Sequence, residues 1–332
     1  MFHKFNVEYG SYVMDSFEFE SGVILKNVKV EYSTSGIPRY DDEGNIVNAI
    51  IYCPNLYGGY SILAEYHEVI KNNNFKKDEY YFIRISSLGI PESCSPSSTG
   101  MRNDFPEYTV KDRVNFKRQF LIERFNFKKC LGVIGEGAGG CDVFTWACEY
   151  PDDMEFIIVL NSSFKTQGHS YVFLKCAESI IESCDDFYSE DYSSSFSMVS
   201  VALFRLLFSG YFPNNVLENL TNDEIDVLME DYVEDGLFMD IHDFKYRNDC
   251  ILNYDIKDKL PNIKTKSLIL GIEGYLFFNP EKDCVPLEDL IEDSKVVIYS
   301  PKTESYYDDG DYSDMGLEIV SFLSQFKKNK KS

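Results

Sequence analysis

Residues 135–139, Gly-Glu-Gly-Ala-Gly, fit, except at the centre, the pattern of a turn that carries a catalytic serine in many acyl-transfer and ester-cleaving enzymes. The pattern is G-x-S-x-G, and its serine attacks an acyl carbon with the help of a histidine and an acidic residue. In this chain the central position is Gly137, which has no side-chain atom that could attack. The turn therefore indicates a scaffold suited to acyl chemistry, with no nucleophile at its centre.

A strand must precede this turn and a helix must follow it. Residues 130–135 form a short apolar segment, as a buried strand requires, and the residues after the turn have helical character. The four glycines between positions 135 and 140 permit a sharp backbone turn, so we predict that Gly137 lies at its apex with a positive φ. The amides of Gly137 and Ala138, together with that of Leu56 after an earlier strand, would form an oxyanion-type nest at the helix N-terminus.

The rest of the chain alternates strand-like and helix-like segments. Residues 17–32 alternate apolar and polar side chains around Gly22, which is typical of an antiparallel hairpin. Helical spacing predicts one helix over residues 108–125 and another from about 315 to 326. Further strands are predicted over residues 48–53, 80–85, 156–160, 267–271 and 295–299. Strands that alternate with helices imply an α/β fold, with a mostly parallel sheet and helices on both faces.

A long segment in the middle of the chain has a different character. Residues 168–244 show helical periods, turns rich in Ser and Asp, and no convincing strand. Within it, residues 206–244 contain ten acidic residues and no Lys or Arg. We predict that residues 168–244 form a helical cap inserted into a core of residues 17–167 and 245–328, with a basic tail over residues 329–332.

Composition and charge exclude several classes of function. The 332 residues are 44% hydrophobic, which suits a globular core, and the net charge of −23 argues against a nucleic-acid or membrane-surface partner because it repels phosphates and anionic lipids. Nine cysteines without paired spacing and a polar start argue against export. No stretch approaches the ~18 uninterrupted apolar residues of a membrane span. We expect a cytoplasmic protein.

Several other stretches, taken with the glycine turn, make the chain resemble the homoserine O-acetyltransferase family of the α/β-hydrolase fold. The motifs fall in order and cover roughly residues 15–325. They are residues 19–22, 30–36, 48–50, 98–100, 104–106, 109–112, 146–147, 150–152, 254–255, 259–260 and 279–280. The resemblance implies an α/β-hydrolase core with a cap insertion, an acyltransferase or hydrolase lineage, and possible association of copies through the cap. It gives no reason to expect a cofactor or a metal.

The same resemblance assigns positions to the family's catalytic triad. The serine falls on Gly137, and the acid falls on or beside Gly274 and Tyr275. The histidine should follow the strand that ends near residue 299, because this fold orders its triad as serine, acid, histidine. The chain's histidines are residues 3, 67, 169 and 242, all of which precede the acid position. We therefore expect no catalytic residue at the inherited positions.

Other groups near these positions are weaker candidates for chemistry. Glu136 is a carboxylate next to the turn, but it stands one residue away from the nucleophile position. Cys141 lacks a downstream histidine that could activate its thiol, and we expect a core residue there. His242, beside Asp240 and Asp243, is expected to make a structural hydrogen bond. The acidic run over residues 308–314 lacks the order of a calcium-binding loop and favours a solvated loop.

Two classes of function remain. The first is a non-catalytic family member, a pseudoenzyme whose cleft or acidic cap binds a small molecule or a protein partner. The second is an acyltransferase or esterase with relocated catalytic residues, for which Glu136 is the leading candidate. The sequence favours the first class, because three catalytic positions are lost together while the surrounding scaffold is retained.

Overall fold

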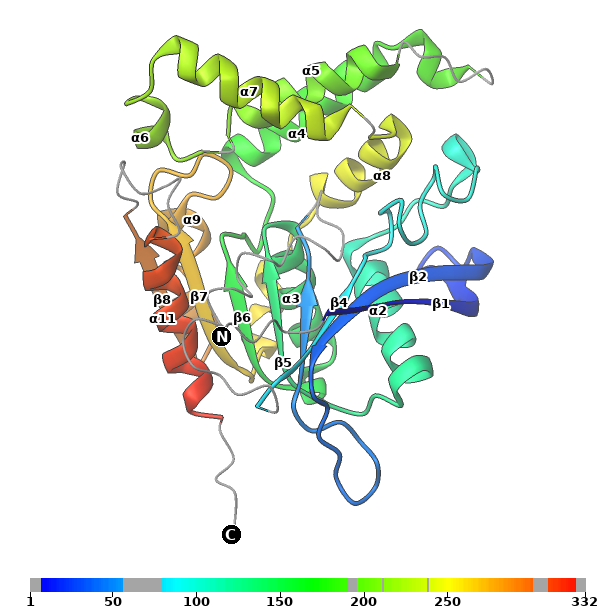
Figure 1. Ribbon diagram of the computed structural model, residues 1–332, viewed down its shortest axis with the longest axis vertical. Coiled ribbons are helices and arrows are strands. Elements are labelled where there is room, and N and C mark those ends of the chain that lie inside the picture. The colour runs from blue at the N-terminus through cyan, green and yellow to red at the C-terminus, as the bar shows by residue number, and fades with distance from the viewer. Residues whose placement is uncertain are drawn as a thin grey trace.

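A computed structural model describes residues 7–55, 79–189, 196–210, 212–237, 239–300 and 310–326. These residues form one eight-stranded sheet in the order β1-β2-β4-β3-β5-β6-β7-β8 (Figure 1). The strands are β1 (Val7–Glu18), β2 (Ile24–Gly36), β3 (Ala49–Cys53), β4 (Tyr81–Ile85), β5 (Cys130–Glu136), β6 (Met154–Leu160), β7 (Lys266–Ile272) and β8 (Ser294–Tyr299). The pairs β1–β2 and β2–β4 are antiparallel and the other pairs are parallel, which confirms the predicted mostly parallel sheet.

The predicted hairpin around Gly22 is present, but its first strand is longer than the pattern indicated. Gly22 has a φ of 83°, and its N–H donates to the carbonyl of Phe19 at 2.8 Å to close the turn. β1 starts at Val7, ten residues before the predicted start at residue 17. Side chains before Met14 are exposed or half-buried on both faces of β1, so this part of the strand lacks the alternation that marks a half-buried strand.

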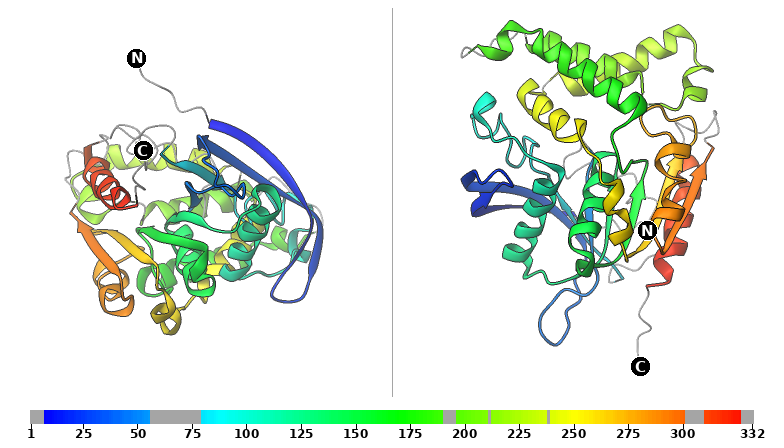
Figure 2. Two further views of the ribbon diagram at one scale, coloured as in Figure 1. Left: turned by 90° about the horizontal axis from the view of Figure 1, so that it is seen from below. Right: turned by 180° about the vertical axis from the view of Figure 1, so that it is seen from behind.

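Alternate residues of the parallel strands point to opposite faces and divide the core into two clusters. On one face Ile51, Ile83 and Val133 belong to the cluster that includes side chains of α2 (Val110–Phe125) and α3 (Ala138–Glu149). On the other face Ile50, Phe82 and Ile134 belong to the cluster that includes residues 315, 319, 322 and 323 of α11 (Gly310–Ser324). Helices therefore cover both faces of the sheet, as predicted (Figure 2).

The segment predicted as a cap is helical and lies outside the sheet. We call α4 to α8 the cap helices: α4 (Gly168–Glu182), α5 (Phe196–Phe208), α6 (Asn214–Leu217), α7 (Asn222–Gly236) and α8 (Ile241–Leu252). They lie together beyond one end of the strands in Figures 1 and 2. α8 begins inside the predicted cap and ends inside the predicted core, so no element ends at residue 244. The predicted tail, residues 329–332, lies outside the described residues.

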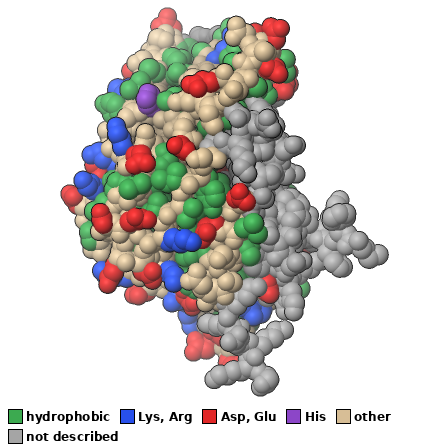
Figure 3. Space-filling model, turned by 90° about the vertical axis from the view of Figure 1, so that its left-hand side faces the viewer, with side chains coloured by type: hydrophobic (Ala, Val, Ile, Leu, Met, Phe, Trp, Pro, Cys, Tyr) green, Lys and Arg blue, Asp and Glu red, His purple; other side chains and the backbone are tan. Residues whose placement is uncertain are grey.

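The surface of the cap is acidic along α7. Exposed carboxylates of this helix include Asp223, Glu224, Asp226, Glu230, Asp231 and Glu234. Acidic side chains are visible on the cap at the top of Figure 3. Two short α-helices, α9 (Pro280–Asp283) and α10 (Leu287–Leu290), lie between β7 and β8. No helix in the described ranges is long and apolar enough to cross a membrane.

Candidate functional site

The glycine turn between β5 and α3 has the geometry expected of the apex of a strand-to-helix turn. Gly137 has φ 53° and ψ −120°, which confirms the predicted positive φ. Its N–H donates to the carbonyl of Leu160 on the neighbouring strand β6 at 3.1 Å, and its carbonyl accepts from the N–H of Gly140 at 3.0 Å. The turn is therefore fixed to the sheet on one side and to the first turn of α3 on the other.

Three of the four glycines at this turn are required by close packing, whereas Gly137 is not. A Cβ added at Gly135 would lie 2.3 Å from the carbonyl oxygen of Gly139, and one added at Gly139 would lie 2.0 Å from the carbonyl oxygen of Cys53. A Cβ added at Gly140 would lie 2.4 Å from the side chain of Ser162. At Gly137 the nearest atom would be the Cβ of Asn55 at 3.5 Å, an ordinary contact. Position 137 therefore has room for a side chain, and only its backbone conformation favours glycine.

A cavity of about 320 Å³ opens above this turn, and we call it the elbow cavity. Its core side is largely polar and includes Asn55, Glu136, Gly137, Ala138, Cys141, Asn161, Ser163, Lys165 and Thr166. The cap helices contribute Ser170, Phe173, Leu174, Phe204, Leu207, Tyr232 and Ile251, and the loop after β7 contributes Tyr275, Phe277 and Phe278. A cavity of this size is at the lower end of the range for small-molecule sites, roughly 300–1,000 Å³.

Several residues singled out from the sequence meet in the elbow cavity. Glu136, Gly137, Ala138 and Tyr275 line it. Gly274 is next to Tyr275, has a φ of 77° and is not among the lining residues. Leu56, the third expected member of the oxyanion-type nest, lies outside the described residues. The cap and β6-end residues of the lining could not be identified from the sequence, because their contribution depends on how the cap packs over the turn.

An aromatic pair stands where the family resemblance placed the acid. The rings of Tyr275 and Phe278 are stacked, with centroids 6.3 Å apart and planes 13° apart. A Cβ at Gly137 would lie 3.8 Å from the Phe278 ring, so this pair borders the turn. The nearby Glu273 is exposed, and its carboxylate accepts a hydrogen bond from the hydroxyl of Ser300. The elbow cavity therefore presents aromatic rings at this position.

The two histidines among the described residues do not line the elbow cavity. His169 is exposed near the start of α4. His242 is buried, with its Nδ1 3.0 Å from Asp240 Oδ1, its Nε2 3.3 Å from the Phe187 carbonyl, and its ring stacked on the Phe187 ring. This arrangement bears out the predicted structural hydrogen bond. Of the acidic run 308–314, residues 308 and 309 lie outside the described residues. The prediction of a loop is wrong for residues 310–314, which form the first turn of α11.

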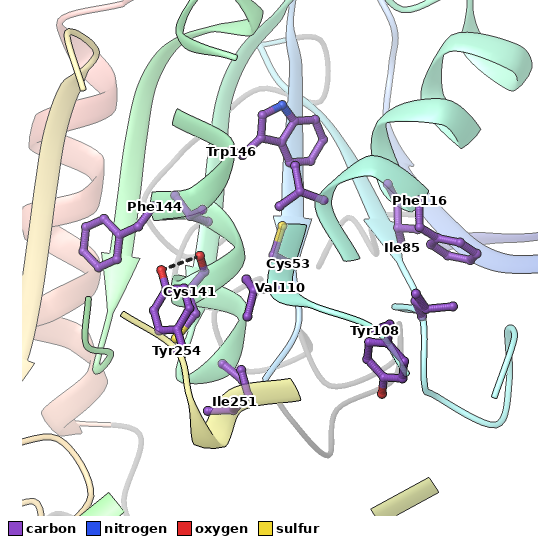
Figure 4. Close-up of a cluster of buried hydrophobic side chains, with 14 of the residues drawn as sticks. Cys53, Ile85, Tyr108, Val110, Phe116, Cys141, Phe144, Trp146, Ile251 and Tyr254 are labelled. Atoms are coloured by element: carbon purple, nitrogen blue, oxygen red, sulfur yellow. Dashed lines mark hydrogen bonds between the residues drawn. The ribbon is translucent and has the colours of Figure 1, made fainter. Parts of the chain in front are cut away.

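Cys141 lines the elbow cavity from the first turn of α3, but its environment disfavours a nucleophile. The side chain is buried, its Sγ lies 3.4 Å from the carbonyl oxygen of Ser163, and Tyr254 Oη donates to the Cys141 carbonyl at 3.0 Å (Figure 4). Burial raises the pKa of the Cys141 thiol to about 12. Because the thiolate is the reactive form, this thiol is held in its unreactive state at neutral pH.

This environment predicts the alkylation pattern of the folded protein. Near neutral pH, iodoacetamide should modify the exposed Cys176 of α4 and leave Cys141 unmodified over the same period. Peptide mass spectrometry resolves the two sites, and unfolding in guanidinium before treatment should make both react. Rapid modification of Cys141 in the folded protein would contradict the protonated, buried thiol.

A buried carboxylate fixes the aromatic loop to the rest of the cavity. Asp283 Oδ1 lies 2.8 Å from Ser163 Oγ and accepts from Gln167 Nε2 at 2.8 Å. Burial raises the pKa of Asp283, while these two donors oppose that shift. Ser163 lies after β6, Gln167 is the N-cap of α4, and Asp283 follows the loop that carries Phe277 and Phe278. Asp283 therefore positions three parts of the cavity wall relative to one another.

The N-terminus of α3 supplies the electropositive end of the elbow cavity. The first amides of a helix have no intrahelical acceptor, and Gly137 offers no side-chain cap for them. Together with the helix dipole, such amides attract an anion or a polarised carbonyl oxygen. The oxyanion-type nest at Gly137 and Ala138 stays a prediction.

Comparison with known proteins identifies the family. No protein-family model matches the chain. A probable acyltransferase of Methanothermobacter thermautotrophicus is 35% identical over 313 residues, covering 93% of this chain and 96% of that protein. A homoserine O-acetyltransferase of Haloferax prahovense is 27% identical over 202 residues, covering 52% of this chain and 46% of that protein.

The fold comparison agrees with the sequence comparison. The crystal structure of homoserine O-acetyltransferase from Staphylococcus aureus superposes with a TM-score of 0.78 at 17% identity, covering 98% of this chain and 97% of that one. At this identity the superposition speaks for the fold alone. With the 35% identical acyltransferase spanning almost the whole chain, the protein belongs to the homoserine O-acetyltransferase-like family of α/β-hydrolase-fold proteins.

Proposed function

We propose that the protein binds a small acyl-bearing molecule in the elbow cavity and forms no covalent acyl-enzyme at residue 137. The observation that carries this proposal is the cavity of about 320 Å³ whose polar end is the N-terminus of α3, with glycine at the centre of the turn. The names of its relatives, acyltransferases, supply the ligand class. In this proposal the protein is a pseudoenzyme of its family.

The chemistry of the cavity supports binding rather than turnover. The amide of Ala138 and the dipole of α3 stabilise a carboxylate or carbonyl oxygen placed above the turn. Such an arrangement lowers the energy of an oxyanion, but it does not supply the attacking group that an acyl-enzyme mechanism requires. Gly137 has no hydroxyl, and no histidine follows the acid position in the chain. In this proposal the interactions at the site hold the ligand and do not lead to an acyl-enzyme.

Replacement of Ala138 by Pro tests the placement of the ligand's oxygen. Ala138 is the first residue of α3, where proline is tolerated because its missing N–H has no helical partner. In isothermal titration calorimetry with straight-chain carboxylates, Ala138→Pro should weaken binding at least about tenfold, since it removes one hydrogen bond to a charged group. Asn222→Pro, the same change at the first residue of α7, should leave binding unchanged. Equal affinities in all three proteins, or no binding by the wild type, would overturn the proposal.

A second candidate is acyl transfer or ester hydrolysis by relocated residues. It is supported by the names of the relatives and by the presence of Glu136, Cys141 and Ser163 in the cavity lining. Glu136 is the strongest of the three, because Cys141 is protonated and the Ser163 hydroxyl is engaged with Asp283 or with the Lys165 carbonyl. Turnover assays of the wild type and of Glu136→Gln separate this candidate from the first.

A further inference from the structure

The elbow cavity is divided into a polar end and an apolar end by the elements that build it. The β-strand ends and α3 contribute mostly amide, hydroxyl and charged groups. Apart from Ser170, whose hydroxyl donates to the Phe277 carbonyl, the cap helices contribute Phe173, Leu174, Phe204, Leu207, Tyr232 and Ile251. Phe277, in the loop after β7, extends the apolar end, and its ring lies 4.9 Å from that of Phe173. A ligand that satisfies both ends must have a polar head and a hydrocarbon tail.

The N-terminus of α3 favours a carboxylate or carbonyl oxygen as the head group. Among the described lining residues, the charged side chains are Glu136 and Lys165. Lys165 Nζ is paired with Asp255 Oδ2 at 2.6 Å, and both side chains are partly exposed to solvent. The α3 N-terminus then remains as the electropositive feature of this part of the lining.

The apolar wall is held by rings that lie directly on glycine backbone. A Cβ on Gly236 of α7 would lie 2.2 Å from the Phe204 ring, and a Cβ on Gly210 would lie 2.4 Å from the Phe277 ring. Phe204 itself is only 6% exposed. Each ring packs directly on the backbone of a glycine, so it cannot move further in that direction. Phe204 and Phe277 therefore set the depth of the apolar end.

The geometry points to a medium-chain, unbranched acyl group as the ligand of the elbow cavity, with its carboxylate or carbonyl at α3 and its tail between α4, α5 and Phe277. This inference rests on the proposed function and names its ligand class. One water occupies about 30 Å³ of liquid, so the cavity holds roughly ten non-hydrogen atoms. Octanoate has about that many atoms.

Calorimetric titration with a series of straight-chain carboxylates from acetate to dodecanoate tests the inference, with each ligand kept below its micelle concentration. Affinity should rise about fourfold for each added methylene up to octanoate, because each buried methylene contributes a similar transfer free energy. It should then level off or fall for decanoate and dodecanoate. A flat series, or tightest binding by acetate or butyrate, would overturn the inference.

Two matched Phe→Leu variants locate the tail. Phe204→Leu removes ring volume from the cavity wall and should move the tightest binding to decanoate or longer. Phe212→Leu makes the same change just after α5, at a buried side chain that packs with Phe208 and Val216 and does not line the cavity. It should keep the octanoate preference, so it controls for general loosening of the cap. The same length preference in wild type and Phe204→Leu would contradict this tail position.

The outcomes also separate the inference from the proposed function on which it rests. Binding of short carboxylates that depends on the Ala138 amide, without a length preference, would retain the proposed function and reject the medium-chain ligand. Absence of binding by every member of the series would reject both. Octylammonium serves as a head-group control, since a cation at a helix N-terminus is unfavourable. If it bound as tightly as octanoate, the ligand orientation would be wrong.

Discussion

Replacing Gly137 by Ser should leave ester hydrolysis and acyl transfer at background, even though the variant restores the G-x-S-x-G pattern. The new Cβ would meet its nearest neighbour, the Asn55 Cβ, at 3.5 Å, so the cavity has room for the side chain. The φ of 53° costs an L-residue on the order of 1–3 kcal/mol, which a folded scaffold can tolerate. Failure of the variant would therefore reflect chemistry rather than misfolding.

The expected failure follows from the missing base. A serine hydroxyl becomes an effective nucleophile only when an oriented histidine removes its proton, and loss of one triad member can cost around 10⁶ in turnover. No histidine follows residue 242, and the described histidines do not line the elbow cavity. The place that the resemblance assigns to the acid, on or beside Gly274 and Tyr275, carries the stacked pair of Tyr275 and Phe278. A hydroxyl at residue 137 would therefore lie at the N-terminus of α3, and no histidine of the described ranges lines the cavity to activate it.

The measurement compares the wild type, Gly137→Ser and Glu136→Gln with p-nitrophenyl acetate and in transfer from acetyl-CoA to homoserine. All three should match a no-enzyme control within the scatter of the assay. Robust turnover by the wild type that disappears in Glu136→Gln would establish Glu136 as a relocated catalytic group and reject the pseudoenzyme proposal. Turnover gained only in Gly137→Ser would show that a base reaches residue 137.

The sequence predicts the turn because its signals are local. The glycine cluster, the short apolar strand before it and the helix after it all lie within about twenty residues, and the structure places Gly137 at the apex with a positive φ. The same locality explains the confirmed helix over residues 108–125. Its start at Thr109 is fixed by a capping box with Asp112, and its end at Asn126 adopts the left-handed conformation.

The apolar end of the elbow cavity could not be predicted, because it depends on contacts between distant segments. The ring of Phe204 packs on the backbone of Gly236, and the ring of Phe277 packs on the backbone of Gly210. Neither pair is marked by spacing or by periodicity in the sequence. Strand β1 was underestimated for a related reason, since its first residues are exposed on both faces and carry no alternation. Tertiary packing, rather than local preference, determines these parts of the molecule.

A buried cluster of charges between α2 and α3 is a further feature without a local signal. Asp142 of α3 is fully buried, with its Oδ2 2.8 Å from Lys117 Nζ and 3.0 Å from Arg113 Nη2 of α2. The negative charge of Asp142 raises the pKa of Arg113 in spite of burial, which opposes the charged form. Two cations therefore depend on one carboxylate in a region from which water is excluded.

Asp142→Asn should destabilise the protein by about 3–5 kcal/mol, because it leaves buried cations without a counter-charge while keeping the side-chain shape. Lys117→Met should cost less, since it leaves Arg113 and Asp142 as a one-to-one pair. Asp255→Asn is the matched control. It breaks the partly exposed ion pair with Lys165 and should cost at most about 1 kcal/mol.

Guanidinium unfolding followed by far-ultraviolet circular dichroism gives the order of the three variants, provided that the slopes of their transitions agree with that of the wild type. The expected order of stability is Asp255→Asn, then Lys117→Met, then Asp142→Asn as the least stable. This order distinguishes a charge effect from a packing effect, because both substitutions keep most of the side-chain volume. Met replaces the apolar stem of Lys117, and Asn has nearly the volume of Asp142. If Asp142→Asn were no less stable than Asp255→Asn, the buried carboxylate would not be the group that holds α2 against α3.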